Sequence, residues 1–297
     1  MNSKTKGILA ILCANTIFGL NIPVTKALVS GWMTPTGYTL IRMLFGSLVF
    51  WFIGLLRKSE KVTSKDMLIM ALGGFLGFVA TQFTFALALQ YTTPVNFALM
   101  MALTPVIVLV LSFLFLKEKI GWKKLLGISM SVSGAALIIL YGSSSAQGRN
   151  DLLGIAIALI CALSYAAYMM LTRNVSVKYG PVTVVKWMFL FAFLIILPFG
   201  SGGVFQLPIF GAETEIPAIG LLVFSLIFST LIAFFLMPVA LGRLKASTVS
   251  IFMNLQPIAA SVVAIIIGQD FFSWDKVLAT LLVIGGVYMV TQTTSNK

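Results

Sequence analysis

The sequence contains no histidine, two cysteines and eight acidic residues, and charged residues make up only 9% of its 297 positions. A soluble domain carries about 25% charged residues, because its surface must be solvated. A chain with so few charges and 59% hydrophobic residues lacks the polar side chains that a soluble surface needs. The composition therefore predicts an all-α membrane protein, since about 20 apolar residues cross a bilayer as a helix.

The shortage of titratable residues also limits the chemistry. All eight carboxylates fall in loops or at the ends of apolar segments, so we expect no proton relay at depth in the membrane. Metal sites and nucleophilic catalysis draw on the same scarce residue types. The sequence therefore predicts no metal, no cofactor and no enzyme activity, and Cys13 and Cys161 are interpreted as packing residues.

Hydropathy predicts ten transmembrane helices. Apolar runs this long satisfy their backbone hydrogen bonds in lipid only as helices. Glycine, proline and charged residues separate nearly all of them. The predicted spans are residues 7–29, 36–56, 67–90, 93–116, 123–142, 152–173, 182–200, 217–241, 246–268 and 274–292.

Membrane topology accounts for the excess of basic residues better than nucleic-acid binding does. With both termini in the cytoplasm, sixteen of the 20 Lys and Arg fall on the cytoplasmic side and only Arg149 and Lys276 fall outside. Short cytoplasmic loops are enriched in exactly these two residue types, as this assignment requires. We therefore predict a multi-pass protein of the cytoplasmic (inner) membrane, with lipid and a small-molecule substrate as partners and no nucleic acid. The oligomeric state is left open.

The second half of the sequence repeats the first. Residues 105–134 align without gaps on residues 257–286, at a constant offset of 152, which matches Pro105 with Pro257 and Gly134 with Gly286. Five spans per half force the two copies to cross the membrane in opposite directions. We therefore predict two inverted five-helix repeats, residues 1–146 and 147–297, an architecture typical of carriers that bind substrate near the midplane.

Short motifs accompany this repeat in both halves. They are Phe18-Gly19, Lys26, Arg42, Pro105, Leu116-Lys117-Glu118 and the Gly127 to Gly134 spacing in the first half, and Pro257, Gly268-Gln269-Asp270 and Gly286 in the second. Together they resemble the EamA-type branch of the drug/metabolite transporter superfamily. The resemblance implies a ten-span secondary transporter of small metabolites, often moved outward, including amino acids and their derivatives.

Two cations inside the predicted spans are candidate substrate contacts. Lys26 and Arg42 lie toward the predicted outer ends of spans one and two, where a cation can attract a carboxylate or phosphate. The alternative is that their long side chains reach the membrane interface without a functional role. That alternative is the favoured interpretation for Arg173 and Lys186, which lie near the corresponding positions of the second half.

Polar and aromatic residues inside the spans supply the other candidates. An amide that faces lipid is left without a hydrogen-bond partner, so a cavity wall is a plausible place for it. Hydrogen bonds between helices, or aromatic packing, are the alternative for each residue. These candidates are Asn15, Gln82, Asn96, Tyr165, Tyr168, Trp187, Asn254 and Gln256.

Pro105 and Pro257 sit deep in spans four and nine, and we interpret them as a matched pair of hinges, with static kinks as the alternative. Such hinges are typical of a carrier that opens alternately to either side. The sequence thus predicts export or facilitated exchange of an amino acid or related organic compound. The alternative is a proton-coupled multidrug efflux carrier of the same fold.

Overall fold

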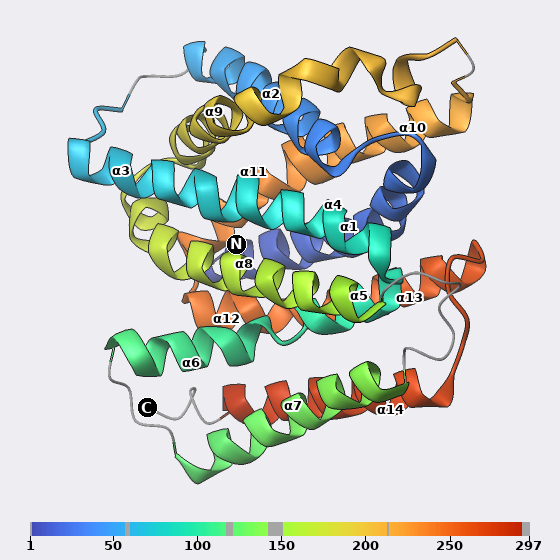
Figure 1. Ribbon diagram of the computed structural model, residues 1–297. Coiled ribbons are helices and arrows are strands. Elements are labelled where there is room, and N and C mark those ends of the chain that lie inside the picture. The colour runs from blue at the N-terminus through green and yellow to red at the C-terminus, as the bar shows by residue number, and fades with distance from the viewer. Residues whose placement is uncertain (1, 57–59, 117–120, 142–150, 213, 293–297) are drawn as a thin grey trace.

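The computed structural model describes residues 2–56, 60–116, 121–141, 151–212 and 214–292, and every regular element within them is helical (Figure 1). Arg149, Lys117 and Glu118 lie outside the described residues. Eight helical stretches of the described chain are long and apolar enough to cross a membrane. Helices α7 (Trp122–Tyr141) and α14 (Trp274–Gln292) complete the ten spans. The predicted all-α membrane fold is confirmed.

Three helices of the first half begin at a threonine that caps them. Thr34, Thr63 and Thr93 each accept a backbone hydrogen bond three residues further on, which satisfies a free N–H group at the helix start. The first half contains α1 (Ser3–Gly31), α2 (Pro35–Leu55), α3 (Ser64–Gly73), a π-helix (Gly74–Ala80), α4 (Thr81–Tyr91), α5 (Pro94–Met101), α6 (Thr104–Leu116) and α7. The second contains α8 (Asp151–Lys178), α9 (Pro181–Gly200), two 3-10 helices (Ser201–Gln206 and Pro208–Phe210), α10 (Ile216–Phe224), a π-helix (Ser225–Ala233), α11 (Phe234–Leu241), α12 (Ala246–Ile251), a 3-10 helix (Phe252–Asn254), α13 (Leu255–Ile266) and α14.

Irregular backbone occurs at matching places in the two halves. The third and eighth spans each contain a π-helix, and the fourth and ninth are interrupted at residues 102–103 and 252–254. Pro105 and Pro257 therefore occupy the first turn of α6 and α13, where proline needs no N–H partner, rather than kinking an unbroken helix. Whether these interruptions move as hinges stays a prediction.

Contacts between the halves are reciprocal. A side chain at Gly134 would come within 2.9 Å of Val283, and one at the repeat-equivalent Gly286 would come within 2.7 Å of the Ser131 backbone. Residues 131 and 283 are themselves related by the offset of 152. Because ascending positions on α7 meet descending positions on α14, these two helices are antiparallel, and Figure 1 shows them side by side.

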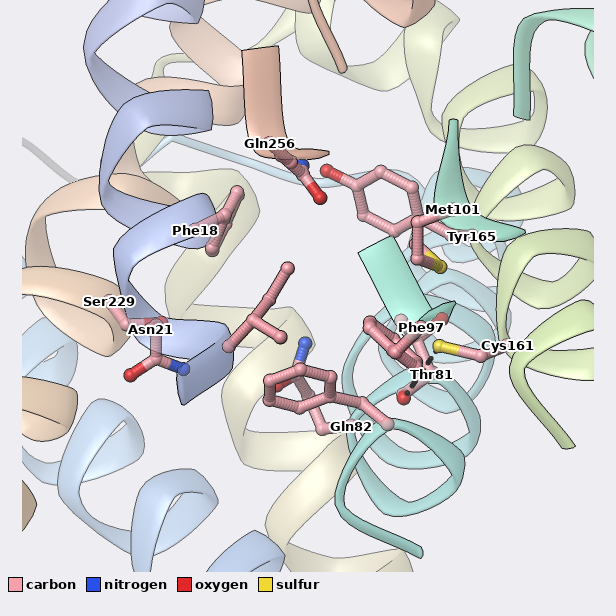
Figure 2. A pocket seen from close by; sticks show the side chains of 12 residues that line it. Phe18, Asn21, Thr81, Gln82, Phe97, Met101, Cys161, Tyr165, Ser229 and Gln256 are labelled. Atoms are coloured by element: carbon pink, nitrogen blue, oxygen red, sulfur yellow. Dashed lines mark hydrogen bonds between the residues drawn. The ribbon is translucent and has the colours of Figure 1, made fainter. Parts of the chain in front are cut away.

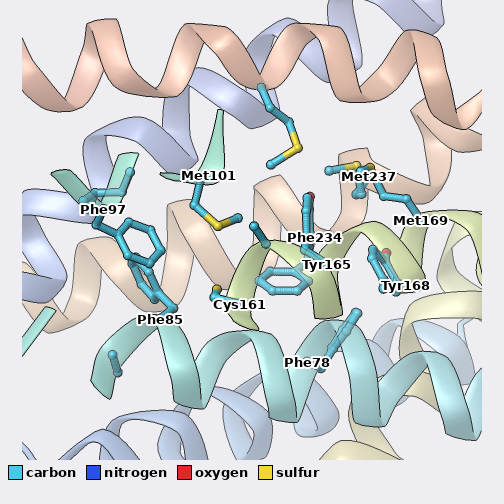
Figure 3. Close-up of a cluster of buried hydrophobic side chains, with 14 of the residues drawn as sticks. Phe78, Phe85, Phe97, Met101, Cys161, Tyr165, Tyr168, Met169, Phe234 and Met237 are labelled. Atoms are coloured by element: carbon cyan, nitrogen blue, oxygen red, sulfur yellow. The ribbon is translucent and has the colours of Figure 1, made fainter. Parts of the chain in front are cut away.

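The helices lie across the view of Figure 1, and their ends define two regions used below. The Asp151 end, at the right, comprises the last turns of α1, the α4–α5 turn, the start of α8 and the α13–α14 connection. The Asp66 end, at the left, comprises the last turn of α2, the start of α3 and the α8–α9 turn. A cluster of buried aromatic and methionine side chains, including Phe78, Tyr168 and Phe234, packs between them (Figure 3).

Candidate functional site

A central cavity lies among the middle parts of six spans (Figure 2). Both interrupted spans and both spans with a π-helix contribute to its wall. Most of the lining is apolar or aromatic, with a few amide and hydroxyl groups, the composition typical of small-molecule sites. The lining residues are Phe18, Asn21, Ile22, Thr81, Gln82, Phe85, Phe97, Met101, Cys161, Tyr165, Ser229 and Gln256.

Three of the candidate residues line this cavity, namely Gln82, Tyr165 and Gln256. Asn15 lies directly behind Gln256, whose side-chain amide donates a 2.7 Å hydrogen bond to the Asn15 Oδ1. Asn15 is fully buried, and its Nδ2 has no hydrogen-bond partner. The structure thus brings together two residues, one from each half, that the sequence analysis named independently as candidate substrate contacts.

Arg42 is fully buried beside the cavity, and among the described residues it has no ion-pair partner. Its guanidinium donates to Gln82 Oε1, to Ser229 Oγ at 2.8 Å and to Thr230 Oγ1 at 2.7 Å. Gln82 and Ser229 also line the cavity. A full positive charge is therefore held behind the cavity wall by neutral partners alone.

The π-helix of the eighth span supplies two of these partners. Within it the Thr230 hydroxyl donates to the Ser225 carbonyl, five residues earlier, at 3.0 Å. The Ser225 hydroxyl in turn hydrogen-bonds Tyr38, which also contacts Thr25 at 2.8 Å. π-Helical turns are often found at functional sites, and here the wider turn places three hydroxyl groups against α2.

Lys26 and Asn96, by contrast, lie at the Asp151 end. Lys26 donates to the carbonyls of Leu89 and Thr92 at 2.6 and 3.0 Å, a favourable place for a cation because α4 ends there. Asn96 Nδ2 donates to Asp151 at 3.2 Å, and the Thr92 hydroxyl donates to the other oxygen of the same carboxylate. The role of Lys26 and Asn96 in substrate binding stays a prediction.

Two carboxylates are more deeply buried than their sequence positions indicated. Asp151 and Asp270 are each 4% exposed, although both lie at helix ends. Asp270 pairs with Lys276, and Asp151 lies within electrostatic range of both. Both lie at helix ends, as the sequence indicated, but the turns of the two halves fold over these ends and shield the carboxylates; the absence of a proton relay at depth stays a prediction.

The remaining candidates lie elsewhere. Tyr168 is buried in the aromatic cluster against Phe78 (Figure 3), and its hydroxyl has no hydrogen-bond partner. Trp187 lies at the Asp66 end, where its ring meets Trp51 edge-on with centroids 5.2 Å apart. Asn254 falls in the interruption of the ninth span, and its Oδ1 is buried without a partner. A substrate contact at these positions is untested.

The helical face of α1 that contains Asn15 and Gly19 contacts another helix. A side chain at Gly19 would come within 2.8 Å of Ala259, so this face packs tightly on α13. The wall of the cavity is the neighbouring face, with Phe18, Asn21 and Ile22. The i, i+4 spacing of Asn21 and Thr25, which hydrogen-bond each other at 3.1 Å, was the sequence signal for a second polar face.

Comparison with known proteins agrees with this architecture. Residues 5–140 and 152–292 each match the EamA-like transporter family. An uncharacterized transporter of Bacillus subtilis, YetK, is 26% identical over 77% of this chain and 69% of its own length. An uncharacterized transporter of Archaeoglobus fulgidus is 25% identical over 98% of each chain. The uncharacterized inner membrane transporter YicL of Salmonella typhimurium is 22% identical over 98% of this chain and 97% of its own length.

A solved crystal structure shares the fold, with a TM-score of 0.66 and 18% identity over 99% of this chain and 97% of that one. The two family matches together cover most of the sequence. The chain therefore belongs to the EamA-like transporter family, and it is a multi-pass membrane transporter.

Proposed function

We propose that this transporter moves a small metabolite, an amino acid or a related organic compound, across the cytoplasmic membrane by alternating access. The direction is export or facilitated exchange, and both termini lie in the cytoplasm. The concentration of lysine and arginine in alternate loops supports that orientation. The central cavity is the substrate site in this proposal.

The main support for this proposal is the environment of Arg42. A buried cation with only neutral hydrogen-bond partners is poorly compensated for its loss of hydration. A carboxylate that enters the cavity can take the place of Gln82 or Ser229 and form a charge-assisted hydrogen bond, which is stronger than either neutral bond. This exchange of partners gives selectivity for a substrate with an anionic group.

The rest of the wall favours a substrate with an apolar part. Phe18, Phe85 and Met101 face the cavity, whereas the amide groups that reach it come from Asn21, Gln82 and Gln256. An amphipathic molecule fits such a lining better than a strongly polar one, because burial of apolar surface adds to the polar contacts.

The backbone supports a two-state cycle. The interruptions before Pro105 and Pro257 lie in two of the six spans that line the cavity, one from each half. Antiparallel packing of α7 on α14 supports an inverted arrangement of residues 1–146 and 147–297. Rocking of one repeat against the other would then open the cavity at one end and close it at the other.

Counterflow in proteoliposomes tests this function. Vesicles that contain the purified protein are loaded with a mixture of unlabelled amino acids and then exposed to the same mixture in radiolabelled form. We expect uptake by wild type, at least a tenfold loss in Arg42→Gln and partial activity in Arg42→Lys, which keeps the charge. Lys65→Gln, an exposed position, is the matched control.

Thermal unfolding of each variant separates loss of transport from loss of fold. Uptake by folded Arg42→Gln at the wild-type rate would contradict the anion site. Absence of counterflow in wild type for every amino acid in the mixture would contradict the proposed substrate class.

A proton-coupled multidrug efflux carrier of the same fold is the second candidate. The burial of Asp151 and Asp270 favours it, since buried carboxylates are common proton carriers in membrane transporters. Flux measured with and without a pH gradient, together with drug-resistance assays on an overexpressing strain, separates the two. Flux of amino acids that does not respond to the gradient favours the facilitator.

A further inference from the structure

A second cavity, which opens to the surface, lies at the Asp66 end between the last turn of α2 and the start of α9. It is lined by Gly54, Glu60, Gly180, Pro181, Val182, Thr183 and Lys186, and it shares no lining residue with the central cavity. Nothing in the proposed function uses this cavity, and it contains one side chain of each charge.

Lys186 is the unusual group in its wall. The residue as a whole is only 9% exposed, and its side chain forms part of the cavity wall; whether it reaches the membrane interface stays a prediction. Its Nζ lies 5.2 Å from the ring centroid of Trp51 and 5.8 Å from that of Trp187. Among the described residues this ammonium has no hydrogen-bond acceptor and no ion-pair partner. Cation–π contacts compensate only part of the cost of burying it.

The backbone of α2 makes room for this side chain. A Cβ at Gly54 would lie 3.2 Å from Lys186 Cδ, and 3.7 Å from its Nζ. The reciprocal contact at the opposite end places Leu40 against Gly200, where a Cβ would come within 2.9 Å of the leucine. The same helix pair thus carries a cation at one end and an apolar side chain at the other.

Glu60 supplies the negative charge of the cavity. Its two carboxylate oxygens accept hydrogen bonds from the Gly180 N–H at 3.1 and 3.2 Å, which places the carboxylate at the N-terminus of α9. Lys186 lies six positions after Gly180, a rise of about 9 Å along the helix. Side chains on a helix lean toward its N-terminus, so the ammonium of Lys186 lies on the side of the cavity that faces Glu60.

We propose that this cavity binds a small zwitterion, with its acidic group on Lys186 and its ammonium group on Glu60. The acidic group of the zwitterion provides the hydrogen-bond acceptors that the Lys186 ammonium lacks. The same ammonium also contacts the aromatic rings of Trp51 and Trp187. Two sources share this chemistry: a free amino acid, and the ethanolamine phosphate headgroup of a membrane lipid. The site goes beyond the proposed function, because binding here is independent of flux through the central cavity.

Equilibrium titration of the purified full-length protein in detergent tests the site, with tryptophan fluorescence as the signal because Trp51 and Trp187 adjoin Lys186. The probes are L-alanine for the free amino acid, phosphorylethanolamine for the lipid headgroup, and inorganic phosphate for an anion alone. We expect saturable binding of at least one zwitterion to wild type, weakened at least tenfold in Lys186→Met and in Glu60→Gln. Lys65→Met, an exposed lysine at the same end, should bind as wild type does.

The outcomes separate the parts of the proposal. Saturation by L-alanine or by phosphorylethanolamine identifies the source. Equal binding to wild type and Lys186→Met overturns the site. Binding of phosphate as tight as that of the zwitterions, and unchanged in Glu60→Gln, overturns the zwitterion. Thermal unfolding confirms that Lys186→Met is folded, and we expect no loss of stability because the substitution removes a buried charge without acceptors.

Discussion

The two ends of the molecule contain the same kind of ion pair in opposite surroundings. At the Asp151 end, the side chains of Asp270 and Lys276 are 2% and 11% exposed, whereas at the Asp66 end those of Asp66 and Lys178 are 13% and 53% exposed. When one partner of a buried ion pair is removed, the other charge stays buried without hydration, and the protein loses stability. The Asp151 end is therefore a closed ionic network, and the Asp66 end has its ion pair near the surface.

This difference indicates which end the structure holds closed. The Asp151 end joins α1 and the α4–α5 turn of the first half to α8 and the α13–α14 connection of the second, through buried polar groups. At the Asp66 end the ion pair between Asp66 and Lys178 lies near the surface. In an alternating-access cycle, opening of the Asp151 end requires these buried contacts to separate.

The largest effect is expected when the buried ion pair is broken. Lys276→Met leaves the Asp270 carboxylate buried without its cation, and its Oδ2 already has no hydrogen-bond partner. We expect a loss of about 3–5 kcal/mol in the free energy of unfolding, measured as a fall in the thermal unfolding midpoint in detergent. Adding Asp270→Asn to this variant should restore most of the loss. A midpoint equal to that of wild type would show that the pair is hydrated.

A smaller effect is expected when the network loses an acceptor. Asp151→Ala leaves the Thr92 hydroxyl and the Asn96 amide without their acceptor, at a cost of about 1–3 kcal/mol. This should favour opening of the Asp151 end, so the thiol of Cys161, which lines the central cavity, should react faster with a water-soluble maleimide. Cys13 is replaced by serine in all samples so that Cys161 is the remaining cysteine.

A rate increase of about tenfold corresponds to 1.4 kcal/mol. Asp151→Asn keeps an acceptor oxygen and is the matched control, with a smaller increase expected. An unchanged rate in Asp151→Ala would mean that the network does not hold the Asp151 end closed.

The sequence predicted the spans and the repeat, because both follow from local composition and from a constant offset. Hydropathy located ten helices, and the matched positions of Pro105 and Pro257 fall at matched interruptions. Three members of the cavity wall, Gln82, Tyr165 and Gln256, were also among the candidates. These residues are polar or aromatic and lie in the middle of apolar spans, a pattern that can be recognised in a single sequence.

Other features depend on contacts between residues far apart in the chain. Arg42 and Thr230 are 188 positions apart, and nothing in the composition near Thr230 indicates a π-helix. The burial of Asp151 depends on Thr92, 59 positions earlier, which packs over the start of α8. Position along a span predicts depth in the membrane, but the number of helices that cover that position is set by the tertiary fold.

The smallest effect is expected at the exposed pair. Lys178→Met removes one of three groups that hydrogen-bond Asp66, whose Oδ2 also accepts from Thr63 and from the Tyr179 hydroxyl, each at 2.7 Å. Water can replace the lost ammonium, because the lysine side chain is 53% exposed, and exposed ion pairs contribute little to stability. We expect a thermal unfolding midpoint close to that of wild type in this variant, in contrast to Lys276→Met. Equal losses in the two variants would contradict the distinction between the ends, since the same chemical change would then have the same effect in buried and exposed surroundings.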